Sequence, residues 1–139
     1  MYAELIADGK HLPAELIKMI IKIKGVDRVI LCTDSLEIAG TDIKEGVMAG
    51  TAFIVEDGVC KLRDRSAFAG SVATSDVLLR FIVNECGYSL LEASKMLSYN
   101  PARLIGTPRG AIEEGYYADL VALDDTLTPC EVFVSGKRV

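Results

Sequence analysis

The stretch VILCTDS, residues 29–35, runs from four apolar or nearly apolar residues straight into a threonine and a carboxylate. A run rich in Val, Ile and Leu is typical of a buried strand, here residues 28–33. Upstream, residues 2–7 form another strand-like run, and apolar side chains keep helical spacing from Pro13 to Gly25. Strand, helix and strand in succession predict a βαβ unit with parallel strands and a right-handed crossover. The expected fold class is therefore α/β.

Polar side chains that could take part in catalysis or binding follow both predicted strands. Asp8 and His11 come after the first strand and Asp34 after the second, and His11 is the only histidine of the chain. Because parallel strands end at the same edge of a sheet, these side chains should share the edge where catalytic groups collect. Two ordinary interpretations stay open: a lone histidine is often a surface or capping residue, and an aspartate after a strand is often an Asx-turn or a helix cap.

After the βαβ unit the pattern changes to loops and a β-hairpin. Residues 46–64 hold two β-rich runs separated by Glu56-Asp57-Gly58, which is a hairpin signal. The segment that follows, residues 63–74, is expected to be a loop.

Helical periodicity returns with an N-cap at Thr74 or Ser75 and a stop at Gly87. A second helix should begin at the Ser89-x-x-Glu92 capping box and be interrupted at Asn100-Pro101, where a short third helix starts. The glycine-rich tail is expected to form short β runs at residues 118–123 and 131–134.

Composition narrows the class of protein. The chain has 139 residues, half of them hydrophobic, and a net charge of −5, which fits one compact unit and argues against a nucleic-acid partner. No apolar run approaches the roughly 18 residues of a membrane span. The cysteines have no C-x-x-C spacing and apolar neighbours, which predicts small buried side chains of a reducing, cytoplasmic compartment: Cys32, Cys60, Cys86 and Cys130.

Five blocks carry a resemblance to a known family. They read IADGKHLP, VILCTDSLEIAG, VEDGVCKL running on to FAGSVAT, SLLEASKMLSYNPARLIG and GAIEEGYYADLVALD. In that order, over essentially the whole chain, they resemble the last third of N-acetylglucosamine-6-phosphate deacetylases of the amidohydrolase superfamily. The NPARLIG and ADLVALD blocks are common across the superfamily, whereas the A-D-G-x-H, T-D and AGS blocks are more specific to the deacetylase.

The resemblance implies a fold. Residues 1–106 would be the last two β/α units of a (β/α)8 TIM-like barrel, with a β-hairpin insertion at about 46–64. Residues 107–139 would be the C-terminal strands of a small β-sandwich. The polypeptide looks cut at its N-terminus, so we expect a C-terminal fragment that is inactive in isolation.

The resemblance also implies roles for individual residues. Asp34 matches the catalytic aspartate, which takes a proton from a metal-bound water and passes it to the leaving amine. The substrate would be N-acetylglucosamine 6-phosphate and the products glucosamine 6-phosphate and acetate, a step of amino-sugar metabolism. The implied substrate-binding residues fall in two loops: Asp8, Gly9 and His11 in one, and Phe68, Ala69 and Gly70 in the other.

The family's metal ligands, a glutamate and two histidines, have no counterpart in this chain. The complete enzyme would hold a divalent metal, zinc or iron, which Asp34 approaches, whereas this chain alone would bind none. The complete enzyme is also expected to be a homo-oligomer, a dimer, because part of its phosphate site comes from a second subunit.

Two other functions stay open. One is a different amidohydrolase that acts on a cyclic amide or an aminated ring, which the tail block supports equally well. The other is a non-catalytic binding or assembly module that completes another subunit through its exposed strand edges.

Overall fold

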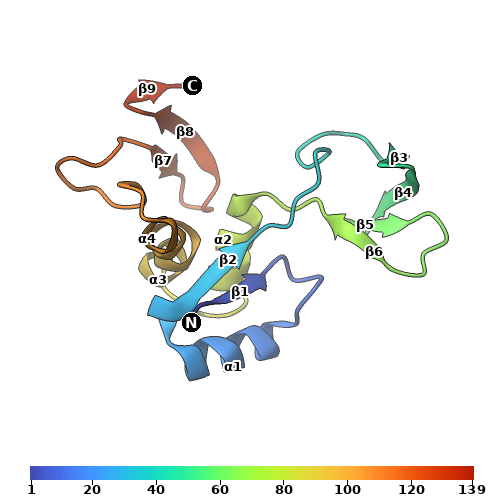
Figure 1. Ribbon diagram of the computed structural model, residues 1–139, viewed down its shortest axis with the longest axis horizontal. Helices are drawn as coiled ribbons and strands as arrows, with labels where there is room; N and C mark the ends of the chain where they lie inside the picture. Colours follow the sequence, from blue (N-terminus) through green and yellow to red (C-terminus); the bar gives the residue numbers. More distant parts are fainter.

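The structure is a computed structural model that describes residues 1–139, and its centre is a βαβ unit (Figure 1). Strands β1 (Ala3–Ile6) and β2 (Val29–Cys32) pair in parallel, and helix α1 (Ala14–Lys24) and a short 3-10 turn η1 (Val26–Arg28) connect them. The predicted strand, helix and strand are therefore confirmed, with each strand slightly shorter than expected.

The core packs helices against this two-stranded sheet. Ile17 and Ile21 project from α1, and Leu78 and Ile82 project from α2 (Ser75–Asn84); all four are essentially inaccessible to solvent. They form one cluster with the apolar side chains of β1 and β2 and with Met96. Burying a side chain of this size contributes roughly 1.5–3 kcal/mol each, so this cluster holds the βαβ unit together.

The next helical segment is continuous, although we expected a break at Asn100. Helix α3 (Leu90–Ser94) begins at the predicted capping box, passes through a π-helical turn η2 (Lys95–Tyr99) and continues as α4 (Asn100–Ile105). The amide of Asn100 donates to the carbonyl of Lys95, five residues back. This wider turn precedes Pro101, which has no N–H to donate, so the helix passes the proline without breaking.

Asn100 is a tether between segments and does not cap a helix. Its side chain is buried, and its amide group donates to the carbonyl oxygens of Val26 and Val29, each at 2.7 Å. These bonds fix the helical segment to the start of β2.

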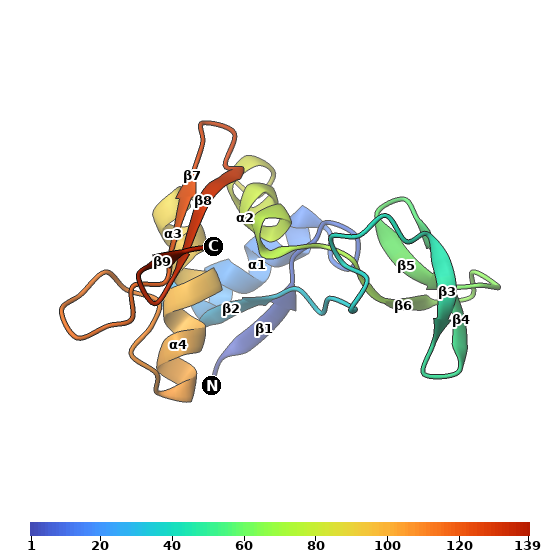
Figure 2. The same ribbon diagram turned by 90° about the horizontal axis from the view of Figure 1, so that it is seen from above.

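The predicted hairpin is present, and it lies within a larger antiparallel sheet. Its strands, in the order β3-β4-β5-β6, are β3 (Glu45–Met48), β4 (Thr51–Glu56), β5 (Val59–Leu62) and β6 (Phe68–Ser71). The expectation of a loop over residues 63–74 was therefore wrong for β6, which pairs with β5 across a bulge. Ile38, Phe53 and Cys60 form a small separate core here, and the sheet projects away from the helices (Figure 2).

The tail forms a third sheet, on the opposite side of the helices from β3–β6 (Figures 1 and 2). Its antiparallel strands are β7 (Leu120–Leu123), β8 (Pro129–Val134) and β9 (Lys137–Arg138), and the last was not anticipated. Val121 is about half exposed. The division at residue 106 into barrel and sandwich parts stays a prediction.

The cysteines differ from expectation in burial. Cys60 and Cys86 are buried, as predicted, but Cys32 and Cys130 are exposed, and all four thiols are free. Cys32 is the last residue of β2, whose one hydrogen-bonded partner strand is β1, so that side chain is left uncovered. No helix is both long and apolar enough to cross a membrane.

Candidate active site

The two predicted loops meet at the carboxyl ends of β1 and β2. Ile6 pairs with Cys32 in the parallel register, so Asp8 and Asp34 each lie two residues beyond the last pair. The βαβ geometry thus brings the two acids to the same edge of the sheet, as the sequence predicted.

Asp8 is the buried acid at this edge. Its side chain is 1% exposed, and one carboxylate oxygen accepts the backbone N–H groups of Lys10 and His11, both at 2.9 Å. The other oxygen lies 2.8 Å from Nδ1 of the His11 ring. Burial by itself raises the pKa of this carboxyl, but the bonds from the two amides and the imidazole outweigh it, so the pKa of Asp8 lies below its usual value.

This arrangement fixes the orientation of His11. An ionised carboxylate only accepts hydrogen bonds, so Nδ1 carries the hydrogen and Nε2 is the atom left for a ligand. The ring also meets the edge of Phe68, with centroids 5.1 Å apart and an interplanar angle of 69°. Two residues that lie 60 positions apart in the sequence, Asp8 and Phe68, therefore hold the His11 ring on two sides. A surface or capping histidine would not need such contacts.

Gly9 allows the turn to lie tightly against helix α2. Its φ is +72°, and a Cβ at this position would come within 2.5 Å of the ring of Phe81. The close approach leaves no room for a Cβ, and the positive φ favours glycine. The shape of the backbone thus accounts for a glycine at this position, and the predicted contact of Gly9 with the substrate stays a prediction.

Ser71 joins the two strand ends and was not among the predicted site residues. Its hydroxyl donates to Asp8 at 3.4 Å and accepts the amide of Ala73 at 2.9 Å. Its own amide donates to the carbonyl of Asp34 at 3.1 Å, and its carbonyl accepts the amide of Leu36 at 3.0 Å. Ser71 is completely buried, so it ties β6 to both loops. The AGS block was the available sequence signal, but it could not reveal these partners.

Asp34 presents a free carboxylate at this edge. The residue is exposed, and its backbone is left-handed, with φ +50°. No hydrogen bond or ion pair involves its side chain, so it forms neither an Asx-turn nor a helix cap. The neighbouring Ser35 hydroxyl donates to the carbonyl of Ala73. The backbone is thus fixed on both sides, through Ser71 and Ser35, while the carboxylate itself points to no protein partner.

The second predicted loop lies on β6. Phe68 is 47% exposed, so it is not a buried anchor of its loop, and its ring reaches His11. Ala69 packs on the small core of the β3–β6 sheet. Gly70 approaches Leu36 so closely that a Cβ would lie 2.8 Å from it. Phe68 is therefore the residue of the three whose side chain reaches the Asp8–His11 turn.

The chain does not carry a metal-ligand set. No group of three or more His, Cys, Asp or Glu side chains is placed to hold a metal ion. Asp34 supplies one carboxylate, and His11 uses one ring nitrogen on Asp8. These donors do not fit a metal centre built by this chain alone.

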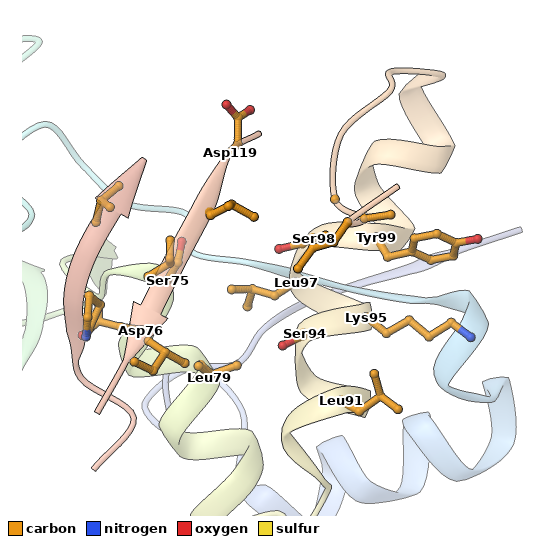
Figure 3. A pocket seen from close by; sticks show the side chains of 18 of the residues that line it. Ser75, Asp76, Leu79, Leu91, Ser94, Lys95, Leu97, Ser98, Tyr99 and Asp119 are labelled. Atoms are coloured by element: carbon orange, nitrogen blue, oxygen red, sulfur yellow. The ribbon is translucent and has the colours of Figure 1, made fainter. Parts of the chain in front are cut away.

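A cavity of about 760 Å³ lies away from this edge, between α2, the α3–η2 segment and the β7–β8 strands (Figure 3). Leu79 and Leu97 face it from the helices, and Leu120 and Val132 line it from the strands. It contains none of the side chains at the ends of β1 and β2. The candidate active site is therefore the Asp8–His11–Asp34 edge and not this cavity.

Comparison with known proteins identifies a family and several relatives of this chain. The profile of the Amidohydrolase family matches residues 2–139. An N-acetylglucosamine-6-phosphate deacetylase of Lysinibacillus sphaericus is 33% identical over 136 residues, which covers 97% of this chain and 35% of that protein. A putative N-acetylgalactosamine-6-phosphate deacetylase of Escherichia coli K12 is 31% identical, covering 98% of this chain and 81% of that protein.

A solved structure gives the same result for the fold. It is a mutant of N-acetyl-D-glucosamine-6-phosphate deacetylase from Mycobacterium smegmatis in complex with N-acetyl-D-glucosamine-6-phosphate. It superimposes with a TM-score of 0.92 at 29% identity, covering 99% of this chain and 37% of that chain. The chain thus spans about 35% of the length of the Lysinibacillus relative and a similar share of this structure.

Proposed function

The chain belongs to the amidohydrolase family, and on that premise we propose that it carries part of the active site of an amino-sugar-phosphate deacetylase. In this proposal β1 and β2 are two strands of a (β/α)8 barrel, β3–β6 is an insertion, and β7–β9 belongs to a β-sandwich. The reaction is hydrolysis of the N-acetyl group of N-acetylglucosamine 6-phosphate. The relatives named for this activity support the substrate class.

The observation that carries the proposal is the pair of strand ends. Asp34 offers an unpartnered carboxylate on a fixed backbone, at the same edge of the sheet as a histidine whose orientation Asp8 determines. Amide hydrolysis needs a base that takes a proton from water and an acid that gives a proton to the leaving nitrogen. In the proposal Asp34 performs both transfers, and Nε2 of His11 contacts the sugar phosphate.

Members of the amidohydrolase family generally use a divalent metal. The donors of this chain do not form a site for one. We propose that the metal ligands lie in the part of the deacetylase that the relatives carry beyond the matched third. The dimeric state expected for the complete enzyme stays a prediction.

A chimera tests the proposal directly. This chain would replace the matched 136 residues of the Lysinibacillus deacetylase, and acetate release would be measured with N-acetylglucosamine 6-phosphate. We expect release above that of the same deacetylase lacking this third. A folded chimera that binds metal and releases no acetate, or one that opens dihydroorotate-like rings instead, would contradict the assignment.

A second substrate has its own support. The Escherichia coli K12 relative is named for N-acetylgalactosamine 6-phosphate, and this chain covers 81% of it. The two sugars differ at C4, so the ratio of kcat/KM values for the two substrates in the same chimera decides between them.

A further inference from the structure

Two arginines differ from all the others in this acidic chain. Five of the seven arginines form an ion pair with a carboxylate: Arg63, Arg65, Arg80, Arg109 and Arg138. Arg28 and Arg103 form none, although acidic residues outnumber basic ones by 20 to 15. Both line the same hollow, so the unpaired guanidinium groups gather at one place.

The hollow has a volume of about 510 Å³ and lies where β1 and β2 begin. This is the end of the sheet opposite to Asp8 and Asp34. Besides the two arginines, its lining includes Lys95 and the phenol rings of Tyr2 and Tyr99. The volume falls in the range of small-molecule sites, roughly 300–1,000 Å³.

The α3–η2–α4 segment brings its cations to one face. Lys95, Tyr99 and Arg103 follow one another at intervals of four residues, and Figure 3 shows Lys95 and Tyr99 extending side by side, away from β7 and β8. The Tyr99 hydroxyl accepts a hydrogen bond from Arg103 at 3.1 Å, and the guanidinium carbon lies 5.5 Å from the ring centroid. The tyrosine therefore holds Arg103 in place without neutralising it.

The charges in the hollow do not cancel. Asp27 is its one carboxylate, and Lys95 is bound to it. Among the side chains that line the hollow, Arg28 and Arg103 then leave an excess of two positive charges, in a chain whose net charge is −5. Unlike a basic stripe, this excess is confined to one hollow, which suits a compact dianion better than a polymer.

We propose that this hollow binds a small phosphate-bearing anion, with Arg28 and Arg103 as its principal ligands. Guanidinium groups bind phosphate oxygens through two parallel N–H bonds, and the tyrosine hydroxyls can donate to the remaining oxygens. The site is separate from the proposed active site, and the proposal does not depend on the deacetylase function.

Binding of inorganic phosphate to the 139-residue chain tests this inference. Phosphate would be titrated at pH 7 and constant ionic strength, and the Nε–H resonances of the arginines followed by NMR. We expect saturable shifts at Arg28 and Arg103. Changing either one to glutamine should weaken binding at least about tenfold, the effect of losing one charge-assisted contact. Glucose 6-phosphate in a parallel titration separates a site for phosphate esters from a site for the free ion.

Arg63→Gln is the matched control, because Arg63 is exposed, pairs with Glu45 and directly follows β5, in a part of the chain that does not line the hollow. It should leave the affinity unchanged. Arg28 forms no side-chain bond, so Arg28→Gln should fold normally, which the thermal unfolding curve verifies. Shifts that do not saturate, or equal weakening by Arg63→Gln and Arg28→Gln, would overturn the proposal.

Discussion

Replacing Asp8 by asparagine should destabilise the chain in a pH-dependent manner. The carboxylate is 1% exposed and accepts bonds of 2.8–2.9 Å from two amides and the imidazole of His11. A hydrogen bond to a charged group contributes roughly 1.5–3 kcal/mol, against about 0.5–1.5 kcal/mol for a neutral one. Removing the charge from three bonds therefore costs about 3 kcal/mol at pH 7.

The pH dependence has a definite sign. The pKa of Asp8 is lower in the folded chain than its ordinary value of 3.8. The stabilisation is therefore complete above about pH 5 and is lost as the pH falls through the folded-state pKa. The gap in unfolding free energy between wild type and Asp8→Asn should be full at pH 7 and shrink below pH 4.

Urea unfolding followed by circular dichroism, repeated from pH 3 to pH 8, measures this gap. Asp64→Asn is the control, since Asp64 also accepts an amide, that of Ser66 at 3.0 Å, but is exposed. Because solvent screens an exposed carboxylate, Asp64→Asn should leave the free energy of unfolding nearly unaltered at every pH. An Asp8→Asn gap below about 1 kcal/mol at pH 7, or one that does not change with pH, would refute the reasoning.

Three further perturbations test the surroundings of the site. Gly9→Ala should cost about 2–4 kcal/mol in unfolding free energy, because it combines positive φ with overlap on a ring of α2; Gly87→Ala has positive φ and open space, so it should cost only about 1–2 kcal/mol. Asn100→Ala removes two side-chain hydrogen bonds, to the carbonyls of Val26 and Val29, and should lower the free energy of unfolding by about 1–3 kcal/mol, whereas a loss under about 1 kcal/mol would mean that water replaces the amide. Phe68→Ala should shift the ring resonances of His11, the single histidine, and unchanged spectra would show that the two rings do not meet in solution.

Much of the fold followed from local patterns. The βαβ unit has strong signals, with apolar spacing in α1 and Gly25 at its end. The capping box at Ser89 forms both of its reciprocal bonds. The hairpin turn lies where Glu56-Asp57-Gly58 places it, between β4 and β5. In each case a few neighbouring residues determine the backbone, so the sequence alone was sufficient.

The features that sequence analysis missed depend on distant partners. Strand β6 reads Phe-Ala-Gly-Ser, which has little β propensity, and it forms because β5 supplies its hydrogen bonds. Asn100 was expected to end a helix, but its partners are carbonyls more than 70 residues away. Ser71 likewise contacts Asp8 across 63 residues. Local propensity contains no information on such pairs.

In the candidate site, too, some features follow from local sequence and others depend on distant partners. The strand–helix–strand pattern of apolar residues predicted Asp8, His11 and Asp34 at one edge of a parallel sheet, and the structure places them there. The tie from Ser71 to both loops and the contact of Phe68 with His11 required the three-dimensional arrangement of β6. The catalytic role of Asp34 is still a proposal, resting on its place at the strand end and on the family.

The rate of acetate release by the chimeric deacetylase with Asp34→Asn tests that central claim most directly. Asp42→Asn serves as the control, because Asp42 is exposed in the same loop and forms no side-chain bond. If Asp34 transfers the proton, its variant should lose about 10²–10⁴-fold in kcat with metal content unchanged, whereas the Asp42 variant should match the parent. An Asp34→Asn chimera that retains activity within a few-fold of the parent would contradict the account.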